Sequence, residues 1–267
     1  FLTLLILGAL YASLKKKDIT AGILLAAAVS LKYYPAIFVI PFLITRNKKT
    51  ILAFFGACLV LLAVIPILIL GWRETVEFVD QLSRGIYAEQ LAAAGENSQS
   101  FFNVFMRWLG LLGHESQTAR FILRTLGYLG VEATIVLIFL LHRHSIPRAL
   151  IWAFVLLSLS VPLFVATSWP HYLVYLPFCQ LFVFIEIQEH RWYSSVHRQI
   201  LFAVLFLSVF LASVFALHLS GHWKLYAGAG LLFVSNTLMM ALSVRLVLSS
   251  LSVVGSSKKA AMISAVG

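Results

Sequence analysis

The sequence predicts an all-α, polytopic transmembrane helical bundle. Of its 267 residues, 61% are hydrophobic and 11% are charged, whereas a soluble domain is nearer half apolar and a quarter charged. Apolar runs of about 20 residues recur, which is the length that a helix needs to cross ~30 Å of hydrocarbon. The runs lack the period-two alternation of transmembrane β-strands. We therefore expect about six full spans, a partial N-terminal span and a broken-helix hairpin.

Positive charge is concentrated in short connections on one side of the predicted bundle. The formal net charge is +10, and basic residues group at 15–17, 46–49 and 143–148, as the positive-inside rule describes for cytoplasmic loops. Membrane orientation accounts for this charge, so we expect the membrane and no nucleic acid as a partner.

The N-terminal part predicts a hairpin. Phe1–Leu14 is a partial span, and Ile19–Thr45 has basic residues at both ends, which a single crossing does not allow. Its middle is interrupted by Lys32-Tyr33-Tyr34-Pro35, where proline disfavours a continuous helix. Two half-helices, 21–31 and 35–44, would each be only ~15–17 Å long. A re-entrant hairpin fits, and a single tilted span is the alternative.

Six further apolar runs predict full spans. We treat 1–249 as one transmembrane domain and 250–267 as a disordered cytoplasmic tail. Because the chain begins at Phe1 with a run too short to span, we expect it to be the C-terminal portion of a longer protein. The predicted spans are Ile51–Gly71, Phe121–Leu141, Leu150–Ala166, Leu173–Ile185, Ile200–Leu217 and Leu225–Leu248.

The segment 72–118 is the one long connection, and it is expected on the extracytoplasmic side. It holds six of the ten acidic residues. Apolar residues recur at three- and four-residue spacing over 76–86, which predicts an amphipathic helix at the membrane interface. Ser100 would cap a second short helix that starts at Phe101. A connection of this length is usually functional.

Several side chains that could bind a substrate are expected on this same extracytoplasmic face. Lys32 lies in an apolar stretch, where its charge is costly unless it reaches water, a carboxylate or a phosphate. It is either a clamp on a lipid phosphate or a lysine that snorkels to the headgroups. The polar stretch 97–100 suits sugar hydroxyls, or is simply a turn and cap. Arg107 would contact phosphate, or lie on the polar face of an interfacial helix.

The turn Ser168-Trp169-Pro170-His171-Tyr172 joins two uncharged apolar runs at the membrane edge. His171 could donate to a phosphate oxygen, and Trp169 could instead belong to an aromatic belt. Glu132 lies inside a span, where an acid is a functional candidate; pairing with Arg124 or Tyr128 is the structural alternative, and we favour it. No metal or nucleotide motif occurs, so no cofactor is expected.

Three segments, in order, resemble family 87 glycosyltransferases. The first carries 21–26, 31–35 and the basic group at 46–49, and is similar to the family's "AGLLLGLAAALKLYPLL…RRR". Ser98-Gln99-Ser100 with Arg107 resembles "NQS…R", and 168–172 resembles "SW-D-H-H". Two positions depart from the family: Ser98 stands where it has asparagine, and Pro170 replaces an acid.

The resemblance implies a GT-C enzyme that transfers a hexose, mannose-like, from a polyprenyl-phosphate donor. The acceptor would be a lipid or glycan on the extracytoplasmic face of a bacterial inner membrane. The catalytic base would be an aspartate upstream of Phe1. The residues expected to bind substrate are Lys32, Tyr34, Gln99, Ser100, Arg107, Trp169 and His171.

Two other classes stay open at this point. A broken helix with a lysine at membrane depth also suits a secondary transporter or lipid flippase, although we find no inverted repeat. A non-catalytic membrane assembly subunit is the third reading.

Overall fold

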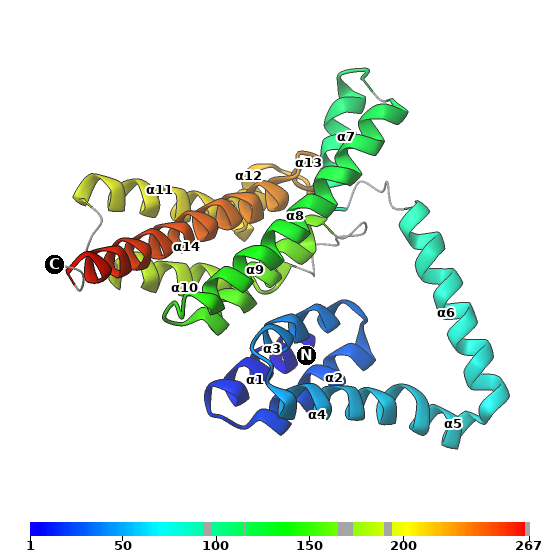
Figure 1. The fold of residues 1–267 in the computed structure, drawn as a ribbon. Helices are drawn as coiled ribbons and strands as arrows, with labels where there is room; N and C mark the ends of the chain where they lie inside the picture. Colours follow the sequence, from blue (N-terminus) through cyan, green and yellow to red (C-terminus); the bar gives the residue numbers. More distant parts are fainter. Residues whose placement is uncertain (93–97, 115, 165–172, 190–193, 265–267) are drawn as a thin grey trace. The chain divides into compact units, whose positions relative to one another are not determined.

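The computed structural model describes residues 1–92, 98–114, 116–164, 173–189 and 194–264 (Figure 1). The protein is 86% helical, and the described ranges contain no strand. Three helices are long and apolar enough to cross a membrane: Lys48–Leu70, Gln117–Arg143 and Leu231–Val254. These observations confirm the all-α membrane fold.

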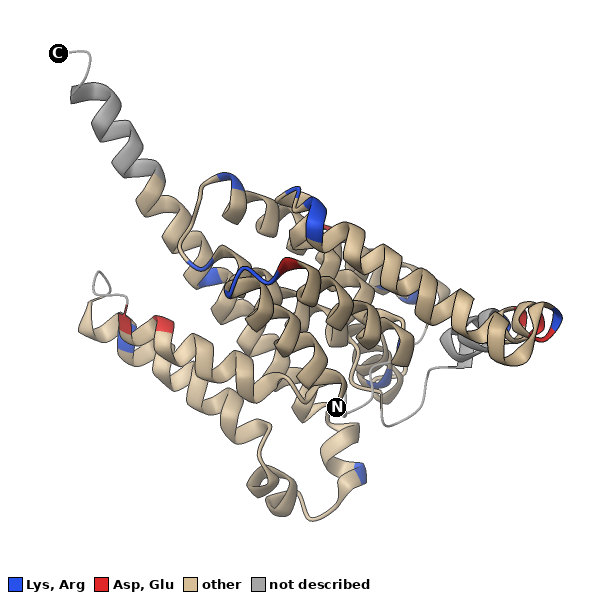
Figure 2. Ribbon diagram, turned by 90° about the horizontal axis from the view of Figure 1, so that it is seen from below, with Lys and Arg blue, Asp and Glu red and all other residues tan. Residues whose placement is uncertain are grey.

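The chain forms two compact units, Phe1–Ala92 and Ala93–Gly267, which are treated separately below. Lys, Arg, Asp and Glu lie mainly at helix ends and connections and along the helix Trp72–Ala92, and few lie inside the long apolar helices (Figure 2). This distribution is what a membrane requires of its spanning segments.

The first unit contains helices joined by tight breaks. In order they are α1 Leu2–Leu14, α2 Asp18–Leu31, the 3₁₀-helix η1 Tyr34–Val39, α3 Ile40–Ile44, α4 Lys48–Leu59, the π-helical turn η2 Val60–Val64, α5 Ile65–Leu70 and α6 Trp72–Ala92. The predicted interfacial helix is thus one continuous helix, α6.

The segment after α2 reverses and returns to the start of that helix. Lys32 is extended, with φ −159° and ψ 139°, and ends α2. Asn47 Nδ2 then donates to Asp18 Oδ1 at 2.9 Å. A single continuous helix would separate these two residues by about 40 Å. The broken-helix hairpin is therefore confirmed, and the tilted span is wrong.

The second half of the hairpin is less regular than predicted. A single helix was expected over 35–44, whereas the structure has η1 followed by the short helix α3. Pro35 and Pro41 each lie in the first turn of one of these pieces. Because proline has no N–H to continue a preceding helix, each one begins a new segment.

Helices α2 and α4 run side by side from the contact between Asp18 and Asn47, and they approach most closely at Gly22. A Cβ atom there would lie 2.5 Å from the Thr50 carbonyl oxygen and 2.8 Å from the Phe54 nitrogen. Only glycine permits this approach, as is common where membrane helices pack through small residues.

The hairpin predicts a specific cross-link. In a background lacking Cys58 and Cys179, Asp18→Cys with Asn47→Cys is expected to be joined by a short bismaleimide, because the two side chains are in contact. Asp18→Cys with Lys32→Cys should not be joined, since α2 separates them by about 20 Å. Gel mobility after cross-linking in membranes checks this. A cysteine at position 47 that reacts only with reagent added outside would contradict the hairpin.

The second unit is built around α9. Its helices are α7 Phe101–Leu111, α8 Gln117–Arg143, α9 Ala149–Phe164, α10 Leu176–Glu189, α11 Ser195–Leu211, α12 Val214–Leu219, α13 Trp223–Gly228 and α14 Leu231–Ser264. Every residue from Trp152 to Leu163 is buried, because α8, α10 and α14 all pack against α9. A helix that is apolar all round belongs in such a central position.

Three of the six predicted full spans form helices of membrane-crossing length in the described residues, and the other three runs form shorter helices. α9, α10 and α11 have 16, 14 and 17 residues. The run predicted over 200–217 is broken after Leu211, because the Ser213 side chain caps a new helix by accepting from Ala216 N. Helix α14 continues to Ser264, through the segment expected to be a disordered tail. The division at residue 249 stays a prediction.

An ion-pair group joins the start of α9 to the end of α10. Arg148 Nη1 lies 2.6 Å from Glu186 Oε1 and 2.7 Å from Glu189 Oε2. The hydrogen bonds to Glu189 and Glu186 raise the pKa of Arg148 above its usual range, so the guanidinium stays charged. These two helix ends therefore lie at the same end of the unit, as the antiparallel topology predicts.

Candidate functional site

Lys32 lies in the break between α2 and η1 of the first unit. Its side chain is half-buried, and its Nζ is 5.8 Å from the centroid of the Tyr34 ring. The Tyr34 side chain is buried beneath it. A cation above an aromatic face is held by the ring's negative potential. The two residues expected to bind substrate in this unit are thus neighbours.

In the second unit, a group of polar side chains gathers at the start of α7. This α7 polar cluster consists of Ser98, Gln99, Ser100, Asn103 and Arg107. Asn103 Nδ2 donates to Ser98 Oγ at 2.8 Å, and Ser100 Oγ caps the helix by accepting from Asn103 N. The predicted N-cap is therefore confirmed. Apart from Arg107, every member is buried.

Arg107 is fixed by two backbone carbonyl groups. Its Nη1 donates to Ser98 O at 2.7 Å, and its Nη2 donates to Ala227 O at 3.2 Å. Ala227 lies in the last turn of α13, and its carbonyl oxygen also accepts from Gly230 N at 3.1 Å. Both acceptors are neutral carbonyl groups, and together they fix the orientation of the planar guanidinium.

Gln99 connects two helix ends. Its Nε2 donates to Ala227 O at 3.0 Å, and its Oε1 accepts from Phe233 N at 3.4 Å, in the first turn of α14. The side chain is 1% exposed. Gln99 thus bonds to backbone groups at the end of α13 and the start of α14, and Ser100 bonds to Asn103 N. That both residues bind substrate stays a prediction.

Removing the Gln99 amide should destabilise the second unit. We expect Gln99→Leu to cost about 1–3 kcal/mol, because the Phe233 N–H loses its acceptor in a buried place. The exposed Gln117→Leu is the matched control and should cost little. Thermal unfolding of the detergent-solubilised full-length protein measures both. An unchanged midpoint combined with lost activity would show instead that Gln99 touches the substrate.

An aromatic cluster under α7 fixes that helix on α9 and α14. It consists of Val104, Leu163 and Phe233, with Phe101, Phe105, Trp108, Phe164, Val234 and Met240 packed around them. Ring centroids are 5.2 Å apart for Phe105 and Trp108, and 5.9 Å for Trp108 and Phe233. Gly230, with φ +73°, allows the approach, since a Cβ there would lie 2.8 Å from Val104. Arg107 is therefore carried by a firmly packed helix.

The remaining predicted residues are distributed differently. Trp169 and His171 lie outside the described residues, and their roles stay predictions.

Glu132 is exposed on α8, while the Arg124 guanidinium lies 5.2 Å above the Phe102 ring, so the pairing that we favoured for Arg124 and Glu132 is not what the structure has. Within the described ranges, no group of three His, Cys, Asp or Glu side chains could hold a metal ion.

The sequence did not point to Ala227. It contributes only its backbone carbonyl, and no side-chain pattern marks an alanine that accepts two hydrogen bonds from residues more than 100 positions earlier. The basic side chain of Arg107 was the only signal in the sequence for this part of the cluster.

Comparison with known proteins gives one match. The family model of glycosyltransferase family 87 matches residues 1–168, more than half of the chain. The hairpin with Lys32 and the α7 polar cluster both lie within the matched range. No curated protein and no solved structure matches the chain.

Proposed function

Because the chain belongs to glycosyltransferase family 87, we propose that this membrane glycosyltransferase moves a hexose from a polyprenyl-phosphate donor to an acceptor on the extracytoplasmic face. We propose a mannose-like hexose, a lipid or glycan acceptor and a bacterial inner membrane, as the family resemblance implies. The proposal needs no metal or nucleotide cofactor.

The observation that carries the proposal is the fixed guanidinium of Arg107. In the transfer, the acceptor hydroxyl attacks the anomeric carbon, the bond from that carbon to the phosphate oxygen breaks, and a general base takes the hydroxyl proton. The leaving polyprenyl phosphate gains negative charge as this bond breaks. A pre-oriented cation beside that phosphate stabilises the transition state, because it needs no reorganisation during the reaction.

We assign supporting roles to the other predicted residues. For Lys32, which lies over Tyr34 in the first unit, contact with a lipid phosphate stays a prediction from the sequence. Gln99 and Ser100 orient Arg107 and the start of α7. Trp169 and His171 complete the substrate-binding set as sequence-based predictions. None of these side chains is proposed as the general base.

The role of Lys32 can be tested against a matched lysine. Lys15 Nζ lies 5.8 Å from the Tyr11 ring centroid, the same arrangement as Lys32 on Tyr34. In membranes carrying the full-length protein, Lys32→Ala is expected to lower hexose transfer from polyprenyl-phosphate hexose by about 10²-fold, the effect of losing one charge-stabilising group. Lys15→Ala should leave the rate unchanged. A wild-type rate for Lys32→Ala would show that Lys32 merely snorkels.

A further inference from the structure

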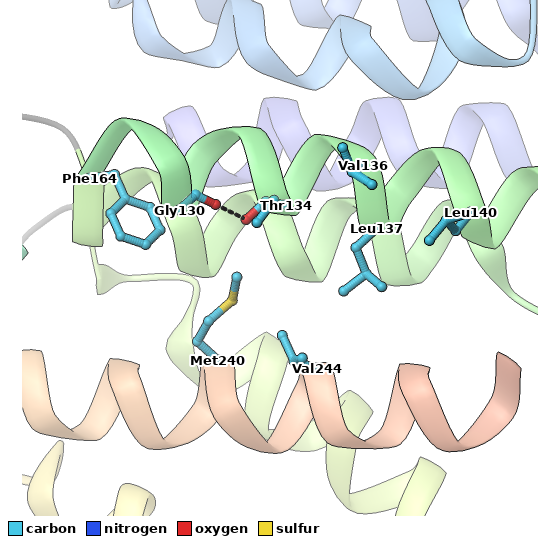
Figure 3. A pocket seen from close by; sticks show the side chains of 9 residues that line it. Gly130, Thr134, Val136, Leu137, Leu140, Phe164, Met240 and Val244 are labelled. Atoms are coloured by element: carbon cyan, nitrogen blue, oxygen red, sulfur yellow. Dashed lines mark hydrogen bonds between the residues drawn. The ribbon is translucent and has the colours of Figure 1, made fainter. Parts of the chain in front are cut away.

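A second feature of the second unit is an apolar cavity between α8 and α14 (Figure 3). Its volume is about 450 Å³, within the range of pockets that hold a small molecule. Ala133, Leu137 and Leu140 of α8 line it on one side, and Met240 and Val244 of α14 line it on the other. Both helices are long and apolar enough to cross a membrane.

The lining offers a ligand almost nothing polar to bind. Its hydroxyl group, Thr134 Oγ1, already donates to Gly130 O at 2.9 Å, as the dashed line in Figure 3 shows. A polar ligand would lose its hydrogen bonds to water there without replacement. A hydrocarbon chain makes no hydrogen bonds to water and so loses none on entering. The apolar lining therefore favours a hydrocarbon ligand.

The Phe164 side chain lies at one end of the cavity lining (Figure 3). The Phe164 ring lies against the backbone of α8 at Gly130, where a Cβ atom would overlap it. From there the lining follows α8 for about ten residues to Leu140, a length of about 15 Å. The cavity is thus elongated along the membrane-spanning direction of α8.

The end of the cavity at Phe164 adjoins the packing that supports Arg107. Phe164 and Met240 line the cavity and also belong to the aromatic cluster under α7. Arg107 is carried by that same helix. The apolar cavity and the Arg107 guanidinium therefore flank the same aromatic cluster. This arrangement is complementary to a lipid with a single hydrocarbon chain and an anionic head group.

We infer that this cavity takes the isoprenoid chain of the lipid-linked sugar donor, with the phosphate towards α7. The inference rests on the proposed function for the donor's identity. A polyprenyl phosphate has one chain and one phosphate, which matches one elongated cavity beside one cation. A two-chain phospholipid would leave its second chain outside.

The test uses binding alone, so it does not depend on transfer. Full-length protein in nanodiscs is photolabelled with a polyprenyl phosphate that carries a diazirine in its chain, and the labelled peptides are mapped. We expect label within 130–140 of α8 and 240–244 of α14. Ala133→Trp, at an exposed lining position, should reduce this label at least tenfold, and the milder Ala133→Leu should reduce it less. Leu126→Trp, exposed on the same helix and outside the lining, should not.

In the labelling experiment, the inference is overturned by label elsewhere only, by label insensitive to Ala133→Trp in folded protein, or by equal labelling of these peptides by a diazirine phosphatidylcholine. A separate arm measures sugar transfer. If the cavity is labelled as expected but wild-type protein transfers no hexose, the proposed function is wrong, whereas the assignment of the cavity to an isoprenoid chain stands. If transfer occurs but Ala133→Trp has the wild-type KM for the long-chain donor, only the assignment of the cavity to the isoprenoid chain is wrong.

Discussion

Arg107→Ala is expected to lower hexose transfer by about 10²–10³-fold, the cost of removing one pre-oriented group that stabilises developing charge. The substitution removes the guanidinium and both of its hydrogen bonds, to Ser98 O and Ala227 O. Arg107→Lys keeps a positive charge, but a compact ammonium cannot hold both carbonyl groups with a planar fork. We therefore expect Arg107→Lys to recover only part of the rate.

Arg124→Ala is the matched control for this prediction. Arg124 is another arginine of the second unit; its guanidinium lies over the Phe102 ring, and it has no assigned role in transfer. Its substitution should leave the rate close to that of the wild type. If Arg107→Ala transfers hexose at the wild-type rate with an unchanged unfolding midpoint, the assignment of Arg107 to the donor phosphate is wrong.

Gly22→Leu is expected to have the largest effect on stability. A Cβ at this position meets the backbone of α4, at Thr50 O and Phe54 N, and a backbone cannot rotate away as a side chain can. Overpacking typically costs 1–3 kcal/mol, and we expect a loss of about 3 kcal/mol or more here, because α2 and α4 must separate. Because the hairpin carries Lys32, transfer should fall as well.

A neighbouring glycine provides the comparison. A Cβ at Gly56, on α4, has nothing within 4 Å, so Gly56→Leu should fold with a midpoint near that of the wild type. The unfolding midpoint and yield of detergent-solubilised protein measure both variants. Equal midpoints for Gly22→Leu and Gly56→Leu would contradict the close packing of α2 on α4.

Local features of the fold were predictable because they depend on neighbours in the sequence. Long apolar runs predicted α8 and the span formed by α4, η2 and α5. The interruption at Lys32 followed from proline chemistry, and the cap by Ser100 followed from its place before an apolar run. Each signal acts within a few residues, where backbone sterics and capping hydrogen bonds operate.

Contacts between distant segments were not predictable in the same way. The sequence marked Gln99 as polar, which suits a sugar, but its partners are backbone groups of α13 and α14, more than 120 residues away. A buried amide must satisfy its donors and acceptors, and no local pattern connects Gln99 to these distant partners. The sequence around Gly22 likewise predicted only a helix. The close approach of the α4 backbone explains why this position is a glycine.

The structure also bears on the choice between enzyme and transporter. A broken helix beside a lysine is shared by both classes, so the hairpin alone does not separate them. The family match over residues 1–168 favours the transferase. The firmly packed α7 supports this reading, since a group that stabilises a transition state must be held in place before the reaction.

The central claim is that this membrane glycosyltransferase uses a polyprenyl-phosphate donor, and the identity of the donor tests it most directly. Full-length protein in liposomes is given hexose-labelled polyprenyl phosphate or, separately, hexose-labelled nucleotide, with a membrane lipid extract as the source of acceptors. We predict that label passes to an acceptor from polyprenyl phosphate and not from the nucleotide, and that Arg107→Ala abolishes most of this transfer. Transfer from the nucleotide donor alone would contradict the account.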